Sequence, residues 1–201
     1  MNLPNKLTMV RIILIPVVAI LLLMAPEHGW PLWLSAGLSF GAAAITDALD
    51  GSIARKRGLI TDFGKLMDPV ADKLLVTAAL VCLVASGLCS AWVLIIVLAR
   101  EFLITSIRMV AVTKGTVIAA NVWGKLKTVI QIAAIVTVIV CQFALSLLGD
   151  LELFDLSVGV GAIIGTVAYW LGEGMLWISA AITLISGAVY AIDARHLFKD
   201  M

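Results

Sequence analysis

Residues 126–148 read LKTVIQIAAIVTVIVCQFALSLL, an apolar run that contains one charged residue, Lys127. A membrane-spanning helix needs roughly 20 predominantly apolar residues. The apolar residues follow one another without the alternation of a barrel strand, so the run predicts a helix. Similar runs lie at residues 7–25, 32–46, 74–87, 91–109 and 175–192. The sequence therefore predicts an all-α, polytopic membrane protein with six transmembrane helices.

The composition agrees with a membrane protein and excludes several other classes. Hydrophobic residues make up 62% of the 201 residues and charged residues only 13%, whereas a soluble domain is nearer half apolar and a quarter charged. A net charge of +1 argues against nucleic acid as a partner. Three cysteines and two histidines are too few for a disulfide framework or a histidine-rich metal site.

All positive charges of the chain can be placed on one side of the membrane. With six spans and the N-terminus inside, the outer segments are residues 24–31, 86–90 and 149–174, and none of them contains Lys or Arg. The positive-inside rule then places both termini in the cytoplasm, and we expect a multi-pass protein of the plasma (inner) membrane. An apolar run at residues 156–171 is expected to be an interfacial or re-entrant part of the last outer segment. A seventh span there would put the basic C-terminus outside.

Five acidic residues stand in residues 46–75, TDALDGSIARKRGLITDFGKLMDPVADKLL. Asp47 and Asp50 are three residues apart and Asp68 and Asp72 are four apart. Each pair therefore shares a helix face, because the second and third apolar runs are short for spans and are expected to continue as helix into residues 47–55 and 68–73. One interpretation is two solvated helix ends that carry harmless charges. The other is a site for two divalent cations, Mg²⁺ or Mn²⁺, because converging carboxylates need cations to neutralise them and oxygen ligands suit these ions. Two such ions roughly 3.5–4 Å apart serve phosphoryl displacement.

Three neighbours of the first acidic pair fit a phosphate-binding role. Gly51 opens space beside the carboxylates, and close approach of a ligand would explain a glycine that costs about 1 kcal/mol in a helix relative to alanine. Ala54 is small and lies on a similar face. Arg55 can bind a phosphate through two N–H groups at once.

A short loop is predicted between the two acidic pairs. Thr61, Gly64 and Pro69 are typical of a loop followed by the restart of a helix. Asp62 falls in this stretch, apart from both pairs, and is expected to be a solvated loop charge.

The spacing D-x2-D-G-x2-A-R-x8-G-x3-D-x3-D, from Asp47 to Asp72, resembles the signature of the CDP-alcohol phosphatidyltransferase family. The resemblance implies transfer of a phosphatidyl group from a CDP-linked lipid to an alcohol, with release of CMP. It implies two divalent cations held by Asp47, Asp50, Asp68 and Asp72, with Asp72 also acting as the general base. It further implies contacts with the nucleotide or the CDP-lipid by Gly51, Ala54, Arg55, Thr61, Asn5 and Thr8.

Two further stretches resemble one subfamily, the phosphatidylglycerophosphate synthases. They are LPNKLTMVRIILIP at residues 3–16 and AREFLITSIRMVAVTKGTVIAANVWGKLKTVIQ at residues 99–131. This resemblance implies CDP-diacylglycerol and glycerol 3-phosphate as substrates at the lipid bilayer, and a homodimer is common in the family.

A phosphate-bearing acceptor needs cations, and basic residues lie near the predicted inner boundary of the membrane. Arg108, Lys125 and Arg100 are the candidate contacts for the acceptor phosphate. The alternative is that these side chains snorkel and bind anionic lipid headgroups. Glu101 is seven residues before Arg108 on one helical face, which predicts a structural ion pair between them.

Two rival functions share part of this pattern. A CDP-dependent cardiolipin synthase, or another enzyme of the same family, would carry the same aspartates, and only the resemblance at residues 99–131 separates it. A cation transporter would place its charges near the bilayer midplane between inverted repeats, whereas these aspartates lie at one edge and no repeat is visible. The sequence favours one enzymatic domain over residues 1–201, with the catalytic motif at 47–72 and an active site that faces the cytoplasm.

Overall fold

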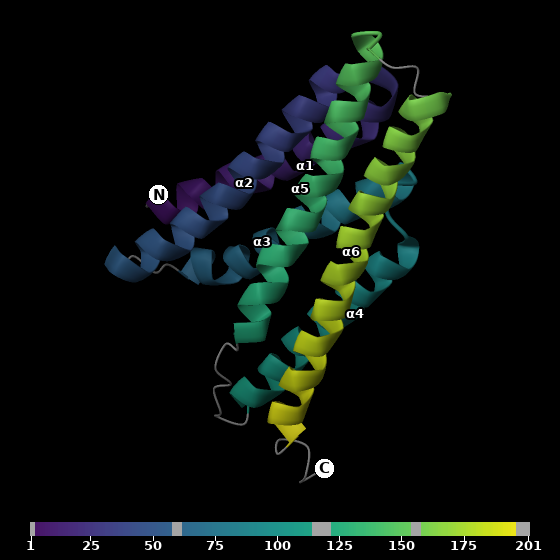
Figure 1. The fold of residues 1–201 in the computed structure, drawn as a ribbon. Helices are drawn as coiled ribbons and strands as arrows, with labels where there is room; N and C mark the ends of the chain where they lie inside the picture. The colour runs from purple at the N-terminus through teal and green to yellow at the C-terminus, as the bar shows by residue number, and fades with distance from the viewer. Residues whose placement is uncertain (1–2, 58–61, 114–121, 154–157, 196–201) are drawn as a thin grey trace.

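The computed structural model contains helices and no strands in the residues that it describes, which are 3–57, 62–113, 122–153 and 158–195. Six helices follow one another along the chain (Figure 1). They are α1 (Leu3–His28), α2 (Trp30–Arg57), α3 (Asp62–Ala85), α4 (Ala91–Thr113), α5 (Val122–Asp150) and α6 (Gly159–Asp193). Each predicted span lies on one of these helices, so the all-α fold class is confirmed.

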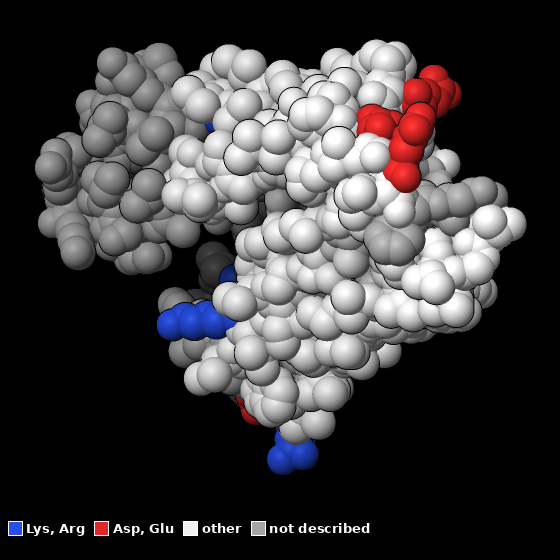
Figure 2. Space-filling model, turned by 45° about the horizontal axis from the view of Figure 1, so that its top comes forward, with Lys and Arg blue, Asp and Glu red and all other residues white. Residues whose placement is uncertain are grey.

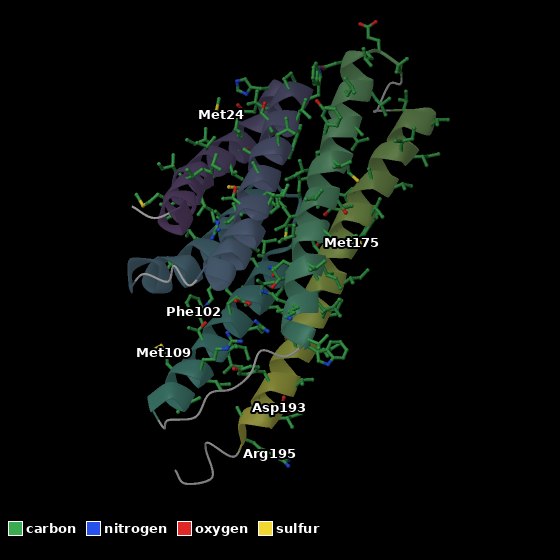
Figure 3. The ribbon with its side chains drawn as sticks, turned by 90° about the vertical axis from the view of Figure 1, so that its left-hand side faces the viewer. Met24, Phe102, Met109, Met175, Asp193 and Arg195 are labelled. Carbon is green, nitrogen blue, oxygen red and sulfur yellow. The ribbon has the colours of Figure 1, made fainter. Side chains whose placement is uncertain are left out.

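The outer surface of the bundle is apolar, as lipid contact requires. By length and composition, three of the described helices can cross a membrane: α1 from Met9 onward, α5 and α6. On α4, the side chains of Phe102 and Met109 are 70% and 66% exposed and point away from the bundle (Figure 3). A soluble monomer seldom exposes large contiguous apolar patches. The protein is therefore a polytopic membrane protein.

The second and third spans continue as helix into the acidic segment, as the sequence predicts. α2 runs on to Arg57 and α3 begins at Asp62, so the connection is confined to residues 58–61, which lie outside the described residues. The loop expected around Asp62 and Pro69 is wrong, because both residues belong to α3. An acidic residue suits the positive end of a helix dipole, and glycine and proline are more frequent in membrane helices than in soluble ones.

The last helix also differs from the prediction. The interfacial or re-entrant segment expected within residues 149–174 is wrong from Gly159 onward, because α6 is one helix from Gly159 to Asp193. At 1.5 Å per residue it is about 50 Å long, which exceeds the roughly 30 Å hydrocarbon core. A glycine in this helix allows close packing against α5. A Cβ at Gly172 would lie 3.0 Å from Cγ2 of Val138 on α5.

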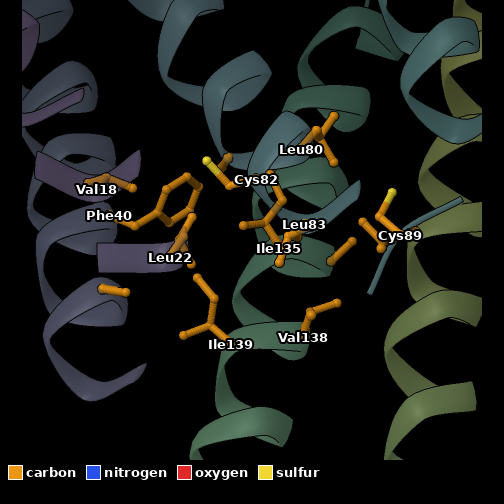
Figure 4. Close-up of a cluster of buried hydrophobic side chains, with 14 of the residues drawn as sticks. Val18, Leu22, Phe40, Leu80, Cys82, Leu83, Cys89, Ile135, Val138 and Ile139 are labelled. Carbon is orange, nitrogen blue, oxygen red and sulfur yellow. The ribbon is translucent and has the colours of Figure 1, made fainter. Parts of the chain in front are cut away.

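α5 connects the two sides of the bundle. It contacts α2 on one side and α6 on the other, while α1 packs against α2 and α3, and α4 packs against α6. Phe40 of α2 is fully buried beside Leu22 of α1 and Ile139 of α5 (Figure 4). Lipid tails are as apolar as these side chains, so such contacts stabilise the bundle through close van der Waals packing rather than through exclusion of water.

The two ends of the bundle differ in charge. Gly29, at φ +81° between α1 and α2, lies beside the end of α5, since a Cβ there would be 3.5 Å from Oδ2 of Asp150. Acidic side chains gather at one end of the molecule and Lys and Arg side chains lie toward the other (Figure 2). Glu27 and Asp150 are exposed at the first end, and Lys125 and Arg195 are exposed elsewhere. This separation agrees with the predicted orientation, which stays a prediction.

Cysteine labelling in intact cells tests the orientation. A cysteine at Asp150→Cys should react with an impermeant maleimide from outside, and a cysteine at Arg195→Cys should react only after the membrane is permeabilised. The unsubstituted protein supplies the background, which should be low because Cys82 and Cys89 are buried and Cys141, on α5, is only partly exposed. Burial and the nearby Glu173 also raise the pKa of Cys89 to about 12, so its thiol stays protonated and unreactive at neutral pH. Labelling of Arg195→Cys from outside would contradict the orientation.

Candidate functional site

The predicted catalytic motif lies on two helices, α2 and α3, which are joined by residues 58–61. Asp47 stands ten residues before the end of α2 at Arg57, and Asp72 stands ten residues after the start of α3 at Asp62. The two helices contact each other, so we expect the two acidic pairs to lie near one another. Gly51, Ala54 and Arg55 follow on α2, and Asp68 precedes Asp72 on α3.

The remaining predicted nucleotide contacts lie on α1 or outside the described residues. Asn5 and Thr8 lie in the first turns of α1, which packs against both α2 and α3, and Thr61 falls outside the described residues. Among the side chains that the structure describes, no three His, Cys, Asp or Glu residues gather into a possible metal site. The four motif aspartates are not among those side chains, so their convergence stays a prediction. Their chemistry fits a hard divalent cation, because all four supply carboxylate oxygens.

A cavity of about 460 Å³ lies between α3, α4, α5 and α6. This volume is in the range of small-molecule sites. Its lining includes five basic residues and one acidic residue: Lys73, Arg100, Arg108, Lys125, Lys127 and Glu101. Figure 2 shows Lys and Arg side chains beside a hollow in this part of the molecule. The three residues that the sequence singled out for an acceptor phosphate, Arg100, Arg108 and Lys125, are thus brought to one cavity from two helices.

Glu101 holds two of the cations in place. Its Oε1 accepts hydrogen bonds from Nη1 of Arg100 at 2.9 Å and from Nζ of Lys127 at 2.5 Å. The side chains of Glu101, Arg100 and Lys127 are only 17%, 11% and 8% exposed. Nη2 of Arg100 also donates to Oγ of Ser186 on α6 at 2.7 Å. A hydrogen-bonded ion cluster therefore ties α4 to α5 and α6 at one wall of the cavity.

The predicted ion pair between Glu101 and Arg108 is wrong. Residues seven apart are separated by about 10.5 Å along a helix, and Glu101 has nearer cations in Arg100 and Lys127. Arg108 instead donates from Nε to the hydroxyl of Tyr190 at 2.9 Å, and its guanidinium carbon lies 5.4 Å from the centre of the Tyr190 ring. The two terminal N–H₂ groups of Arg108 form the fork that suits two phosphate oxygens.

The sequence analysis missed several members of this site. Lys73, Ser186 and Tyr190 line the cavity but were not predicted as contacts. Lys127, a further basic residue near the predicted inner boundary, is a partner of Glu101. Ser186 and Tyr190 are four residues apart on a mostly apolar helix, so they share a face. That polar pair is the signal that could have identified α6 as a wall of the cavity.

Comparison with known proteins identifies close similarity along most of the chain. Residues 1–192 match a protein family described as CDP-alcohol phosphatidyltransferase. A CDP-diacylglycerol–glycerol-3-phosphate 3-phosphatidyltransferase of Bacillus subtilis is 40% identical over 178 residues, covering 84% of this chain and 92% of the relative. A protein of the same name from Rickettsia typhi is 37% identical over 198 residues, covering 98% of this chain and 99% of the relative. A probable phosphatidylglycerophosphate synthase of Mycobacterium tuberculosis is 36% identical over 186 residues, covering 92% of this chain and 84% of the relative.

Removal of Glu101 should destabilise the protein, because it leaves Arg100 and Lys127 as buried cations without their shared carboxylate. Loss of one partner of a buried ion pair costs about 3 kcal/mol. For a chain of this size, that corresponds to a fall in Tm of roughly 6–12 °C. Thermal unfolding of Glu101→Ala in detergent measures this change. Lys125→Ala, which removes an exposed charge from the same cavity, should lower Tm by no more than about 2 °C. Equal Tm values for the two variants would contradict a structural role for the cluster.

Proposed function

The chain belongs to the CDP-alcohol phosphatidyltransferase family, and we propose that it transfers the phosphatidyl group of CDP-diacylglycerol to glycerol 3-phosphate. The products are phosphatidylglycerophosphate and CMP. The relatives that carry the name of this activity match along most of their length. The observation that favours a phosphorylated acceptor is the cavity in which five basic residues face one carboxylate. A neutral alcohol would not require this excess of positive charge.

The cations of the cavity supply the acceptor phosphate with its counter-charge. Glycerol 3-phosphate is a dianion near neutral pH, and a bound dianion needs fixed cations close to it. Arg108 offers its guanidinium fork, Lys125 offers a point charge at the exposed rim, and Arg100 is held by Glu101 at the buried wall. In this arrangement Arg108 and Lys125 are the principal acceptor contacts, and Arg100 supports them.

Asp72 takes the proton of the acceptor hydroxyl in the proposed reaction. The acceptor oxygen forms a bond to the lipid-side phosphorus, the bond from that phosphorus to the bridging oxygen breaks, and CMP leaves. Asp72 stands at the junction between the motif and the cavity, because Lys73, the next residue, lines the cavity. A general base must come within hydrogen-bond reach of the proton that it removes.

The family generally uses divalent metals, and we assign them to Asp47, Asp50, Asp68 and Asp72. Two ions, Mg²⁺ or Mn²⁺, would neutralise negative charge on the diphosphate when bound. Nucleotide and CDP-lipid contacts are assigned to Gly51, Ala54, Arg55 and Thr61 within the motif and to Asn5 and Thr8 on α1. The packing of α1 against both motif helices supports the last two assignments.

The lipid tails of the donor and a cytosolic acceptor can meet only where the membrane meets water. We therefore place the active site at the cytoplasmic face of the plasma (inner) membrane, in a single domain over residues 1–201 that works as a homodimer. The exposed apolar faces of the described helices provide the bilayer contact that such a site needs. A cardiolipin synthase would differ in its acceptor, so an acceptor assay separates the two enzymes.

Substitution of the motif aspartates tests the metal assignment. Asp47→Ala, Asp50→Ala and Asp68→Ala should each abolish CMP release while the protein still inserts in the membrane, because each removes a charged oxygen ligand. Asp62→Ala is the matched control, since it removes an aspartate at the start of α3 that belongs to neither pair. Near-normal turnover in any of the first three variants would remove that aspartate from the metal site. A large loss of activity in the control would mean that Asp62 has a catalytic role.

Arg108→Lys tests the acceptor assignment, because it keeps the charge but removes the planar fork. Charge-assisted hydrogen bonds are worth about 1.5–3 kcal/mol each, so the KM for glycerol 3-phosphate should rise roughly tenfold to hundredfold. Lys125→Ala should also raise this KM, while the KM for CDP-diacylglycerol should barely change in either variant. Arg195→Lys, at an exposed arginine outside the cavity, should leave both KM values unchanged. A rise in the KM of the CDP-lipid alone would assign Arg108 and Lys125 to the donor or to lipid headgroups.

A further inference from the structure

Lys73 connects the motif helix to the wall of the cavity. It lies on α3, directly after Asp72, and its Nζ donates a hydrogen bond to Oγ1 of Thr105 on α4. Both residues line the cavity, and both side chains are half-buried. Because α3 and α4 are joined by the turn at residues 86–90, this contact brings together parts of the two helices that lie far from the turn.

Toward Lys73, the hydroxyl of Thr105 acts only as a hydrogen-bond acceptor. The threonine hydroxyl has one hydrogen, which it donates to the backbone carbonyl oxygen of Glu101 at 2.7 Å. One of the two lone pairs on its oxygen accepts a hydrogen bond from the Lys73 ammonium. A lysine ammonium has three N–H donors, so one is used by Thr105 and two are available to a ligand in the cavity. The same helical turn of α4 thus fixes Lys73 through Thr105, and Arg100 and Lys127 through Glu101.

We propose that Lys73 is a further phosphate-binding residue, held by Thr105 between the aspartate motif and the cation-lined cavity. The proposal rests on the proposed function and adds to it a residue that binds phosphate and a positioning residue. The ligand chemistry is a phosphate oxygen, either on the acceptor phosphate or on the donor side next to the cytidine. A half-buried ammonium that is already oriented binds an anion with less loss of side-chain freedom than a mobile surface lysine.

Charges around Lys73 agree with an anionic ligand. The charged residues that line the cavity with it are four more basic residues, from α4 and α5, and Glu101. Oε1 of Glu101 is already shared by Arg100 and Lys127, and Lys73 is bonded to a neutral hydroxyl instead of a carboxylate. An incoming phosphate would therefore meet Lys73 without displacing an ion pair.

The test compares four variants of the full-length protein in detergent with Mg²⁺ present. Lys73→Met removes the charge and keeps the apolar stem. Thr105→Val removes the hydroxyl and keeps the shape, whereas Thr105→Ser keeps the hydroxyl. Thr137→Val is the control, because Thr137 also donates to the carbonyl four residues earlier, at 2.9 Å, but lies on α5 away from the cavity. Calorimetry gives the Kd values of inorganic phosphate and CMP, and steady-state assays give the KM values of both substrates.

Lys73→Met should weaken one of the two probes roughly tenfold to hundredfold, and Thr105→Val should weaken the same probe about threefold to tenfold. Thr105→Ser and Thr137→Val should bind both probes as the unsubstituted protein does. Weaker phosphate binding with a higher KM for glycerol 3-phosphate assigns Lys73 to the acceptor. Weaker CMP binding with a higher KM for CDP-diacylglycerol assigns it to the donor.

Unchanged Kd values for both probes in Lys73→Met would overturn the proposal. If that variant does not fold, Thr105→Val decides in its place, and unchanged affinities there would overturn the proposal equally. A different result would contradict the proposed function, namely no release of CMP by the unsubstituted protein with glycerol 3-phosphate. The binding measurements decide the role of Lys73 in either case.

Discussion

An ionised side chain in a bilayer must lie at the edge of the hydrocarbon or be neutralised by a partner, because a charge at the centre of a span costs on the order of 2.5–3.5 kcal/mol. The described carboxylates that are buried follow this rule. Glu101 is shared by Arg100 and Lys127. Glu173 on α6 accepts hydrogen bonds from the backbone N–H of Ser90 at 3.2 Å and from Nε1 of Trp177 at 3.0 Å. It thereby satisfies an amide at the start of α4 that has no partner within its own helix.

The same rule explains why basic residues gather around one cavity. Five cations with one carboxylate leave an excess of positive charge, which would be unfavourable in lipid unless water or an anion reaches it. A cavity of about 460 Å³ provides the space for both. The ion cluster around Glu101 gives this cavity a fixed wall, and Arg108 and Lys125 complete it near the surface. A phosphate-bearing substrate would supply the missing negative charge, which links the stability of this part of the bundle to the proposed chemistry.

Much of the fold could be predicted from the sequence, because each span is a local apolar pattern and lipid requires a helix wherever such a pattern crosses it. The continuation of α2 through Arg55 and of α3 back to Asp68 was predicted because the second and third apolar runs are short for spans. Both are confirmed, and α3 begins earlier still, at Asp62. The run at residues 156–171 was misassigned because it was weighed as a separate span that would put the basic C-terminus outside, whereas from Gly159 onward it is the first part of α6. Gly172 in fact packs against Val138 of α5, a contact between helices that no single-helix pattern contains.

In the candidate site too, local features could be predicted from the sequence and contacts between helices could not. Arg100, Arg108 and Lys125 could be selected by type and by position near the inner boundary, and the structure brings them to one cavity. The partners of Arg108 and Glu101 could not be predicted, because Tyr190 and Lys127 come from other helices and only tertiary packing brings them close. Helical periodicity within α4 favoured the pair Glu101–Arg108, and it failed where nearer cations were available.

In the proposed reaction this membrane protein joins a CDP-activated lipid to a phosphorylated alcohol. The most direct measurement is CMP release from CDP-diacylglycerol by the purified protein, with Mg²⁺, across a panel of acceptors that includes glycerol 3-phosphate, glycerol and phosphatidylglycerol. We expect rapid release of CMP with glycerol 3-phosphate and formation of phosphatidylglycerophosphate, with little release for the other two acceptors. Release that depends on phosphatidylglycerol, or that is as fast with glycerol as with its phosphate, would contradict it.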